Sequence, residues 1–252
     1  MATVSQRTPR KLSSPARLRN HTALITGATR GIGLAIARAL ANEGCNLIVT
    51  SRDEKSLGKL SRELARKKVR VLAYPCDVRD PHSVDDLFRA VRREFRNLNI
   101  LINNAGIAHP SMRVDQLPYP VWRDVFATNV DGTFLITQAA LGLMKRGATI
   151  VNNLSIAATR VFSGSAAYNA SKHAALGLTN TLREELRSQG IRVIGLLPGA
   201  TDTDIWKTLW SQAPRKKMMS PETVAEALLE AILLPPNTTV ENLEILPTAG
   251  TL

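Results

Sequence analysis

The sequence predicts a single α/β domain in which a doubly wound parallel sheet carries helices on both faces. Two patterns predict it. From residue 22 onward, short apolar runs alternate with longer segments of helical period, and a glycine-rich turn stands between the first apolar run and the first helical segment. The length of 252 residues fits one domain of this class.

The elements follow from this alternation. Strands are expected near residues 22–26, 46–51, 69–74, 98–102, 148–153, 191–196 and 240–246. In the first helix, Leu34, Ala37, Leu40 and Ala41 fall on one stripe, and Gly44 ends it. Further helices are expected at about 54–67, 81–96, 121–144, 166–189 and 221–233.

Composition excludes several classes of protein. Hydrophobic residues make up 44% and aromatic residues 4%, which excludes an intrinsically disordered, collagen-like or disulfide-stapled chain. No apolar run reaches the roughly 18 residues that a membrane span needs. Cys45 and Cys76 form no CxxC pair, and the histidines are scattered, so neither a disulfide framework nor a metal site is expected. A reducing, cytoplasmic setting is the simplest expectation.

The N-terminus differs from the rest of the chain. Residues 1–20 hold five basic residues and no acid, within a chain of formal charge +12. They are expected to form a disordered basic arm ahead of a domain at 21–252. The alternative is an organelle transit peptide, since such segments are also Arg-rich and acid-poor, although the arm's apolar residues are too sparse for an amphipathic helix.

Residues 26–33, directly after the first strand, read TGATRGIG and precede an amphipathic helix. Glycines let backbone N–H groups approach a pyrophosphate, whose charge the helix N-terminus stabilises. The order strand, turn, helix favours a dinucleotide site over the alternative, a purely structural tight turn. The candidate phosphate-binding residues are Gly27, Thr29, Arg30, Gly31, Ile32 and Gly33.

The end of the second strand indicates which dinucleotide is bound. An NAD enzyme usually carries Asp or Glu there for the ribose 2′-hydroxyl, but this chain has Ser51 and Arg52. A guanidinium suits a 2′-phosphate, and Arg30 adds a second cation. The alternative is that both arginines are solvated surface charges, with Asp53 and Glu54 close by. NADP is the expected cofactor.

Three further residues form a candidate catalytic set. Tyr168 and Lys172 lie one helical turn apart, so they share a helix face, and Ser155 stands at the end of a strand. An adjacent ammonium lowers the pKa of a phenol, which can then exchange a proton with a carbonyl or alcohol oxygen. Ser155 can hydrogen-bond the same oxygen. Tyr and Lys at this spacing alone are ordinary helix-surface residues.

Taken together, these residues resemble the single-domain form of the short-chain dehydrogenase/reductase family over nearly everything after residue 20. The family often has Ser-Ser-x-x-Gly where residues 155–158 read SIAA, so the difference falls on the substrate wall and leaves Ser155 in place. The matching motifs in chain order are TGxxxGxG at 26–33, Asp77 with Val78, NNAG at 103–106, Asn129, the set Ser155, Tyr168 and Lys172, and Pro198-Gly199 followed by Thr201 and Thr203.

The resemblance implies a Rossmann-type seven-stranded sheet and hydride transfer between nicotinamide and a carbonyl carbon, with Tyr168 delivering the proton. Lys172 would hold the nicotinamide ribose, Asn129 would complete a proton relay, and Asp77 would hydrogen-bond the adenine. A homotetramer or homodimer through the helices at 121–144 and 166–189 is also implied. The further cofactor-binding residues that it implies are Val78, Asn104, Ala105, Gly106, Pro198, Gly199, Thr201 and Thr203.

The substrate is expected to be a small carbonyl or alcohol compound of apolar character. Loops at 108–113 and 156–162 and a lid at about 201–219, which carries Trp206 and Trp210, would surround it. Among family members, 3-oxoacyl-(acyl-carrier-protein) reductases and carbonyl reductases look most similar. Two other functions compete: a catalytically weak NADP sensor, and a nucleic-acid-binding protein, for which the chain lacks a motif and a stacking surface.

Overall fold

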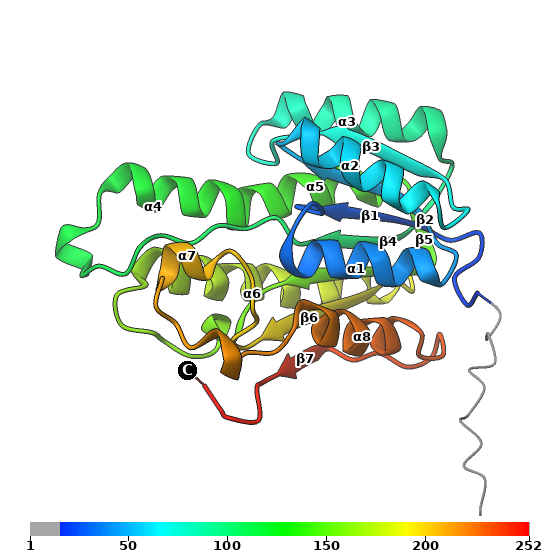
Figure 1. The fold of residues 1–252 in the computed structure, drawn as a ribbon. Coiled ribbons are helices and arrows are strands. Elements are labelled where there is room, and N and C mark those ends of the chain that lie inside the picture. The colour runs from blue at the N-terminus through cyan, green and yellow to red at the C-terminus, as the bar shows by residue number, and fades with distance from the viewer. Residues whose placement is uncertain (1–15, 252) are drawn as a thin grey trace, which may run out of the picture.

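The computed structural model describes residues 16–251, in which parallel strands form one seven-stranded sheet (Figure 1). The strand order is β3-β2-β1-β4-β5-β6-β7: strands β1 to β3 are added toward one edge of the sheet and strands β4 to β7 toward the other, so the winding reverses between β1 and β4. In such sheets, ligands bind beyond the carboxyl ends of the strands at the reversal. The strands are β1 (Thr22–Thr26), β2 (Asn46–Ser51), β3 (Val71–Pro75), β4 (Leu98–Asn103), β5 (Met144–Asn153), β6 (Arg192–Pro198) and β7 (Asn242–Ile245).

Helices cover both faces of the sheet. One core contains residues of α1, α2 and α8, and the other contains residues of α3, α5 and α6. Within residues 16–251, no helix combines the length and the apolar character needed to cross a membrane. The helices are α1 (Gly31–Asn42), α2 (Glu54–Ala65), α3 (Pro81–Glu94), α4 (Tyr119–Phe126), α5 (Gly132–Leu141), α6 (Ala166–Arg187), α7 (Trp206–Leu209) and α8 (Pro221–Ile232).

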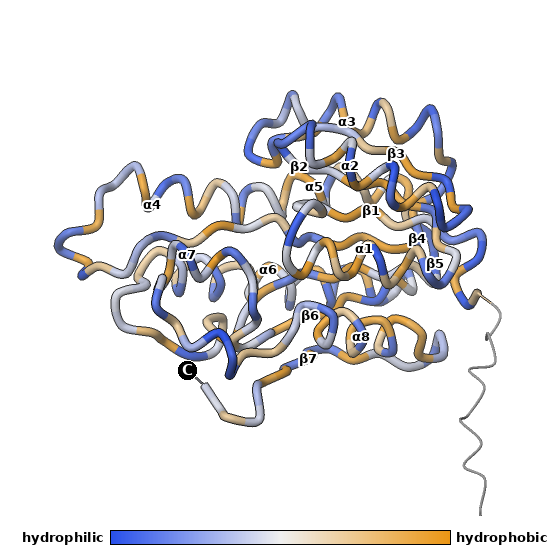
Figure 2. The backbone as a smooth tube through the Cα atoms, in the orientation of Figure 1, coloured by the Kyte–Doolittle hydropathy of each residue, from blue (hydrophilic) through white to orange (hydrophobic). Residues whose placement is uncertain are grey.

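The hydropathy of each element matches its place in these layers. All five residues of β1 are buried, because helices cover the strand on both sides. Along the tube in Figure 2, the central strands are largely hydrophobic, whereas hydrophilic stretches recur along the helices. Leu40 of α1 and Leu57 of α2 enter one core, and Phe88 of α3 enters the other. The sheet is therefore held between two separate apolar layers, as expected for a doubly wound fold.

The long helix expected at 121–144 is instead divided. α4 runs into a π-helical segment, Ala127–Asp131, and α5 then continues only to Leu141. The chain enters β5 at Met144, with an irregular register between Leu98 and Ile100 of the neighbouring strand. The expectation was wrong at this end because residues 141–144 are nearly all apolar, so the hydrophobic period does not mark where the helix stops.

Most of the expected basic arm lies outside the described residues, but Arg17 and Leu18 contact the domain. Leu18 is 4% exposed, and its N–H donates to the Glu43 carbonyl oxygen over 3.0 Å. The Arg17 guanidinium pairs with the carboxylates of Glu43 and Glu230. The packed part of the chain thus begins before the expected boundary at residue 21, because one apolar side chain and one paired arginine fix the segment in place.

Candidate active site

One cavity of about 1140 Å³ lies beyond the carboxyl ends of the strands. Its wall includes the glycine turn and the end of β2 on one side, and Ser155 and Tyr168 on the other. β2 and β5 are separated by three strand spacings, about 14 Å, so the cavity suits an elongated ligand. Of the predicted site residues, only Gly33 and Asn129 are missing from the cavity wall.

The glycine turn between β1 and α1 is built for close approach. Gly27 and Gly31 have positive φ angles of 62° and 53°. A Cβ atom on Gly27 would lie 3.0 Å from the Ala105 Cα, and one on Gly31 would lie 3.1 Å from the Thr203 Cγ2. Helix α1 begins at Gly31 with no side-chain cap and no acidic residue in its first turn. Its first N–H groups are therefore left for an anion in the cavity.

Gly33 does not line the cavity, and its surroundings indicate that it serves close packing. A Cβ atom there would lie 2.5 Å from the Gly27 carbonyl oxygen and would overlap the Asn104 side chain. That amide donates to the carbonyl oxygens of Thr26 and Gly27, over 2.9 and 3.0 Å. Gly33 therefore allows the helix to pack against the turn and against the second asparagine of the NNAG segment.

Two arginines lie at the end of the cavity formed by the glycine turn and β2. The exposed Arg30 and Arg52 side chains both belong to its wall, together with Ser51. The carboxylate of Asp53 accepts hydrogen bonds from the Ser56 N–H and hydroxyl, over 3.2 and 2.6 Å, and so caps α2. These bonds lower the pKa of Asp53. The Asp53 carboxylate beside Arg52 is thus hydrogen-bonded to the first turn of α2.

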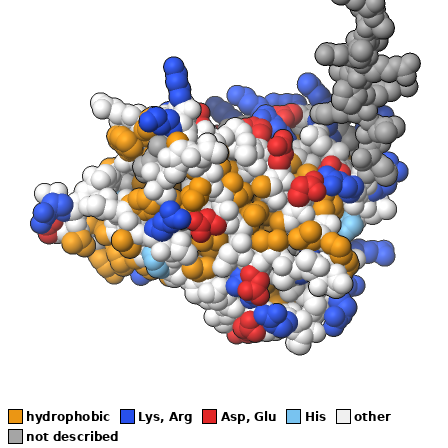
Figure 3. All heavy atoms as spheres, turned by 90° about the horizontal axis from the view of Figure 1, so that it is seen from below, with side chains coloured by type: hydrophobic (Ala, Val, Ile, Leu, Met, Phe, Trp, Pro, Cys, Tyr) orange, Lys and Arg blue, Asp and Glu red, His pale blue; other side chains and the backbone are white. Residues whose placement is uncertain are grey.

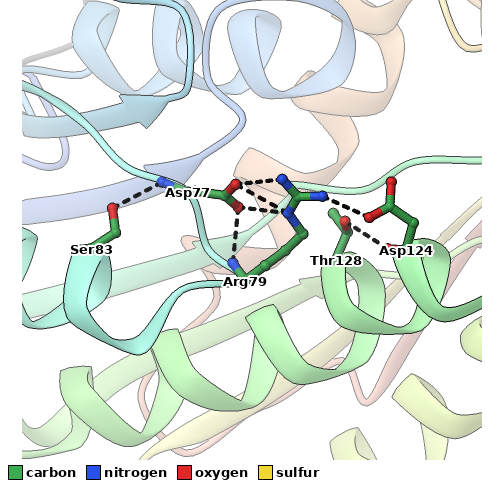
Figure 4. Close-up of polar contacts among 5 residues, drawn as sticks. All are labelled: Asp77, Arg79, Ser83, Asp124 and Thr128. Carbon is green, nitrogen blue, oxygen red and sulfur yellow. Dashed lines mark hydrogen bonds and ion pairs between the residues drawn. The ribbon is translucent and has the colours of Figure 1, made fainter. Parts of the chain in front are cut away.

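Asp77 and Val78 follow β3 and line the cavity near this end. The Asp77 carboxylate is held by Arg79, whose guanidinium also reaches Asp124 on α4 (Figure 4). The hydrogen bonds from Arg79 lower the pKa of Asp77. Val78 packs so closely that a Cβ atom on Gly132 would lie 2.6 Å from its Cγ2. The sequence reasoning missed Arg79; its only signal was a basic residue two positions after an acid.

The candidate catalytic residues Ser155, Tyr168 and Lys172 all line the cavity. Ser155 caps a short 3-10 turn and accepts from the Ala157 N–H over 3.1 Å, while Tyr168 and Lys172 lie one turn apart on α6. The Lys172 Nζ lies 5.6 Å from the centre of the Tyr168 ring and donates to the Asn153 carbonyl oxygen over 2.9 Å. The chain thereby places a hydroxyl, a phenol and an ammonium at one end of the cavity.

The protonation behaviour of this set differs from the expectation. Burial raises the pKa of the Tyr168 phenol, and a hydrogen bond with Ser155 lowers it by less. Burial also lowers the pKa of Lys172 to about 8. The sequence reasoning expected the ammonium to lower the pKa of the phenol, but it could not include desolvation, which disfavours both charged forms.

Asn129 lies in the π-helical segment, behind the cavity wall. Its Oδ1 accepts from the Ile107 N–H, and its Nδ2 donates to the Ile107 carbonyl oxygen, each over 2.9 Å. The Nδ2 also donates to the Ser171 hydroxyl on α6 over 3.0 Å. A Cβ atom on Gly106 would lie 3.3 Å from the Asn129 Oδ1 and 3.7 Å from the Lys172 Nζ. The small residue therefore lets both side chains approach the NNAG segment.

The segment after β6 forms the remaining wall. Pro198 ends the strand, and the Gly199 N–H donates to the Ile245 carbonyl oxygen over 2.7 Å. Thr201 contributes its own carbonyl oxygen to the indole N–H of Trp206, over 2.8 Å, which fixes the start of α7 above the cavity. Thr203 reaches across to Gly31. Among residues 16–251, no group of three or more His, Cys, Asp or Glu could hold a metal ion.

Comparison with known proteins agrees with this arrangement. The family model for short chain dehydrogenases matches residues 21–214. The chain belongs to the short-chain dehydrogenase family. Within that family, it is 35% identical over 236 residues to sulfoacetaldehyde reductase 2 of Chromohalobacter salexigens, covering 89% of this chain and 93% of the relative. It is 33% identical over 227 residues to an uncharacterized oxidoreductase of Staphylococcus aureus, covering 89% of this chain and 96% of the relative.

The fold of this chain is also similar to solved structures of short-chain dehydrogenases and reductases. An alcohol dehydrogenase from Thermococcus sibiricus, complexed with 5-hydroxy-NADP, superimposes with a TM-score of 0.86 at 29% identity, covering 92% of this chain and 98% of that one. A Burkholderia cenocepacia short chain dehydrogenase in complex with NADP has a TM-score of 0.84 at 30% identity, covering 92% and 99%. An actinorhodin polyketide ketoreductase with NADPH has a TM-score of 0.80 at 31% identity, covering 92% and 98%.

Proposed function

We propose that this short-chain dehydrogenase is an NADP(H)-dependent oxidoreductase that interconverts a carbonyl compound and a secondary alcohol, with Tyr168 as general acid and base. One observation carries the proposal. A single cavity has two arginines at the end beside the glycine turn and β2, and Ser155, Tyr168 and Lys172 at the other.

The residues of the cavity fit a nicotinamide dinucleotide. The uncapped start of α1 offers N–H donors to a pyrophosphate, and a Cβ atom at Gly27 or Gly31 would occupy the space between the turn and its neighbours. Arg30 and Arg52 suit a 2′-phosphate, whereas the nearest acid, Asp53, is engaged in capping α2. Three related proteins have known structures in complex with 5-hydroxy-NADP, NADP and NADPH. NADP(H) is therefore the cofactor we propose.

The chain's own groups supply the proton chemistry. When bound, the nicotinamide supplies or takes up the hydride. In the reduction direction, the Tyr168 hydroxyl gives its proton to the carbonyl oxygen, and the Ser155 hydroxyl donates a hydrogen bond to the same oxygen. The raised pKa of Tyr168 keeps that proton in place at neutral pH. The nearby Lys172 ammonium stabilises the phenolate that the transfer leaves.

The substrate that fits best is a neutral, apolar carbonyl compound. Among the described residues of the wall, the basic side chains are Arg30, Arg52 and Lys172, so none is left over to pair with an anionic substrate. A sulfonate such as sulfoacetaldehyde is therefore disfavoured, although a relative carries that name. The wall beside Ser155 and under the lid is rich in apolar side chains: Leu154, Ile156, Phe162, Ile205, Trp206, Leu209 and Trp210.

Two narrower functions remain alternatives. A 3-oxoacyl-carrier-protein reductase would need a basic surface for an acidic partner. The one face seen in Figure 3 carries acidic and basic side chains interspersed, so that face presents no continuous basic surface. The similarity to a polyketide ketoreductase keeps acyl thioesters in the substrate panel. A catalytically weak NADP sensor is disfavoured because Ser155, Tyr168 and Lys172 all line the same cavity.

The deciding experiment measures nucleotide binding first and turnover second. NADPH and NADH are titrated against the purified protein, and oxidation of the preferred nucleotide is then followed with apolar ketones, acyl thioesters and sulfoacetaldehyde. We expect tighter binding of NADPH, turnover with apolar ketones, and a loss of turnover of about 10²-fold or more in Tyr168→Phe with nucleotide binding retained. Failure of both nucleotides to bind would refute the proposal, and full turnover by Tyr168→Phe would refute the role of Tyr168.

Assembly and location complete the proposal. The exposed Phe134 on α5 supports a homodimer or homotetramer, which size-exclusion chromatography with light scattering would resolve. Cys45 and Cys76 are both buried free thiols, which supports a reducing, cytoplasmic setting.

A further inference from the structure

We propose that Arg79 is a positioning residue for the cofactor, which holds the Asp77 carboxylate in the orientation that receives the adenine and ties it to α4. The proposal rests on the nucleotide use proposed above. Arg79 itself is not part of the cavity wall, whereas Asp77 is. Its effect on the nucleotide must therefore pass through Asp77.

The contacts between the two residues leave the carboxylate little freedom (Figure 4). The Asp77 Oδ1 accepts from the backbone N–H of Arg79 over 3.1 Å and from its Nε over 2.9 Å. The Oδ2 accepts from Nη2 over 2.6 Å, with Nε farther away at 3.1 Å. A bidentate pair of this kind fixes the plane of a carboxylate as well as its position.

Counting acceptor positions shows what remains for a ligand. Each carboxylate oxygen accepts about two hydrogen bonds. On the Oδ1, Arg79 donates its backbone N–H and its Nε, and on the Oδ2 it donates its Nη2 at 2.6 Å and the same Nε hydrogen at 3.1 Å. The Nε has only one hydrogen and lies nearer the Oδ1, so the Oδ2 is the oxygen with room for a further donor, which an exocyclic amine such as that of adenine supplies. Because Arg79 fixes the plane of the Asp77 carboxylate, the Oδ2 accepts that donor from one direction only.

One contact connects the same loop to α4, which leads into the π-helical segment that carries Asn129. The Nη1 of Arg79 donates to the Asp124 Oδ1 on α4 over 2.7 Å, and the Thr128 hydroxyl donates to the Asp124 carbonyl oxygen over 2.9 Å. Figure 4 shows Asp77, Arg79 and Asp124 in one continuous row between the loop after β3 and α4. Val78 of the same loop packs closely on Gly132, the first residue of α5, and so gives the loop a second contact with this helical region.

The other side of the loop is anchored as well. The Asp77 N–H donates to the Ser83 hydroxyl on α3 over 3.1 Å, so the backbone is set by α3 and the side chain by Arg79. The side chains of Asp77 and Arg79 are 28% and 29% exposed, so water screens the pair only in part. Loss of the guanidinium would therefore release the carboxylate while leaving its backbone in place.

The experiment is a double-mutant cycle on nucleotide affinity. The dissociation constant of NADPH is measured by titration for the wild type, Arg79→Gln, Asp77→Ala and the double variant, and kcat is measured at saturating NADPH. We expect Arg79→Gln to weaken NADPH binding about tenfold, roughly 1.4 kcal/mol, with a much smaller change in kcat. In the Asp77→Ala background, the same substitution should have no further effect, because Arg79 then has no carboxylate to orient.

A control removes another arginine that pairs with an aspartate, outside the cavity wall. Arg89 pairs with Asp86 on the exposed side of α3 and is absent from the cavity wall, so Arg89→Gln should bind NADPH as the wild type does. Equal loss from Arg79→Gln in both backgrounds would overturn the proposal, as would unchanged or tighter binding in the wild-type background. A wild type that binds no NADPH would instead refute the proposed function.

Discussion

Replacement of Gly33 by alanine tests the claim that this glycine serves packing rather than the ligand. The new Cβ atom would lie 2.5 Å from the Gly27 carbonyl oxygen, which belongs to a tight turn and cannot move alone. It would also displace the Asn104 amide, which donates to Thr26 and Gly27. The substitution therefore strains the turn and breaks two hydrogen bonds at once.

The magnitude follows from these contacts. Two lost hydrogen bonds cost about 1 kcal/mol each, and forcing a methyl group into a filled site costs about 1–3 kcal/mol more. The expected loss in the free energy of unfolding is thus about 3–5 kcal/mol. For a chain of 252 residues, each kcal/mol shifts Tm by about 2–4 °C, so Gly33→Ala should lower Tm by about 10 °C.

Thermal unfolding without nucleotide measures this shift, and Gly58→Ala is the matched control. Gly58 lies within α2, where a Cβ atom would meet only the Arg62 Nη1 at 3.9 Å. Alanine there should raise Tm by about 2 °C, because it reduces the entropy of the unfolded chain without strain. A Tm for Gly33→Ala within about 2 °C of the wild type would refute the packing argument.

Two further predictions concern charge. Arg52→Ala should lower the preference for NADPH over NADH in kcat/KM by about 10- to 100-fold, since a charged hydrogen bond to phosphate contributes about 1.5–3 kcal/mol; equal losses with both nucleotides would contradict a 2′-phosphate contact. The pKa of Lys172 is lowered from 10.5 to about 8, so between these values the unfolded chain binds a proton that the folded chain does not. The free energy of unfolding should therefore rise with pH from 8 to 10 in the wild type, by about 2 kcal/mol more than in Lys172→Met, when both are unfolded by urea without ligand. Parallel pH curves for the two proteins would show that the lysine is not desolvated.

The sequence predicted the bounds of an element well where the hydrophobic period stops at a residue that ends strands or helices, such as glycine. β1 and β2 have the expected bounds, because short β-branched and aliphatic runs end at a glycine turn or at Arg52. The prediction was wrong where one apolar segment passes into the next, as between Leu141 and Met144. Leu18 is buried ahead of the expected domain start at residue 21, and a single buried leucine leaves no periodic signal in the sequence.

The candidate site was predictable for residues whose roles follow from their neighbours in the chain. A glycine turn after a strand, an arginine at the end of the next strand, and a tyrosine and lysine one helical turn apart are local patterns, and almost all of these residues line one cavity. The roles of Gly33 and Arg79 were not predictable in this way. Each depends on a contact outside its own turn or helix, with Asn104 in one case and Asp124 in the other.

The sequence by itself determined the order of strands and helices along the chain, the position of the glycine turn and the identity of the groups available for proton transfer. These depend on residue type and short-range spacing. Only the tertiary structure decided the pKa directions of Tyr168 and Lys172, the packing role of Gly33 and the capture of Asp77 by Arg79. Desolvation and hydrogen-bond pairing depend on which atoms surround a group. Those atoms come from segments far apart in the chain, and folding alone brings them together.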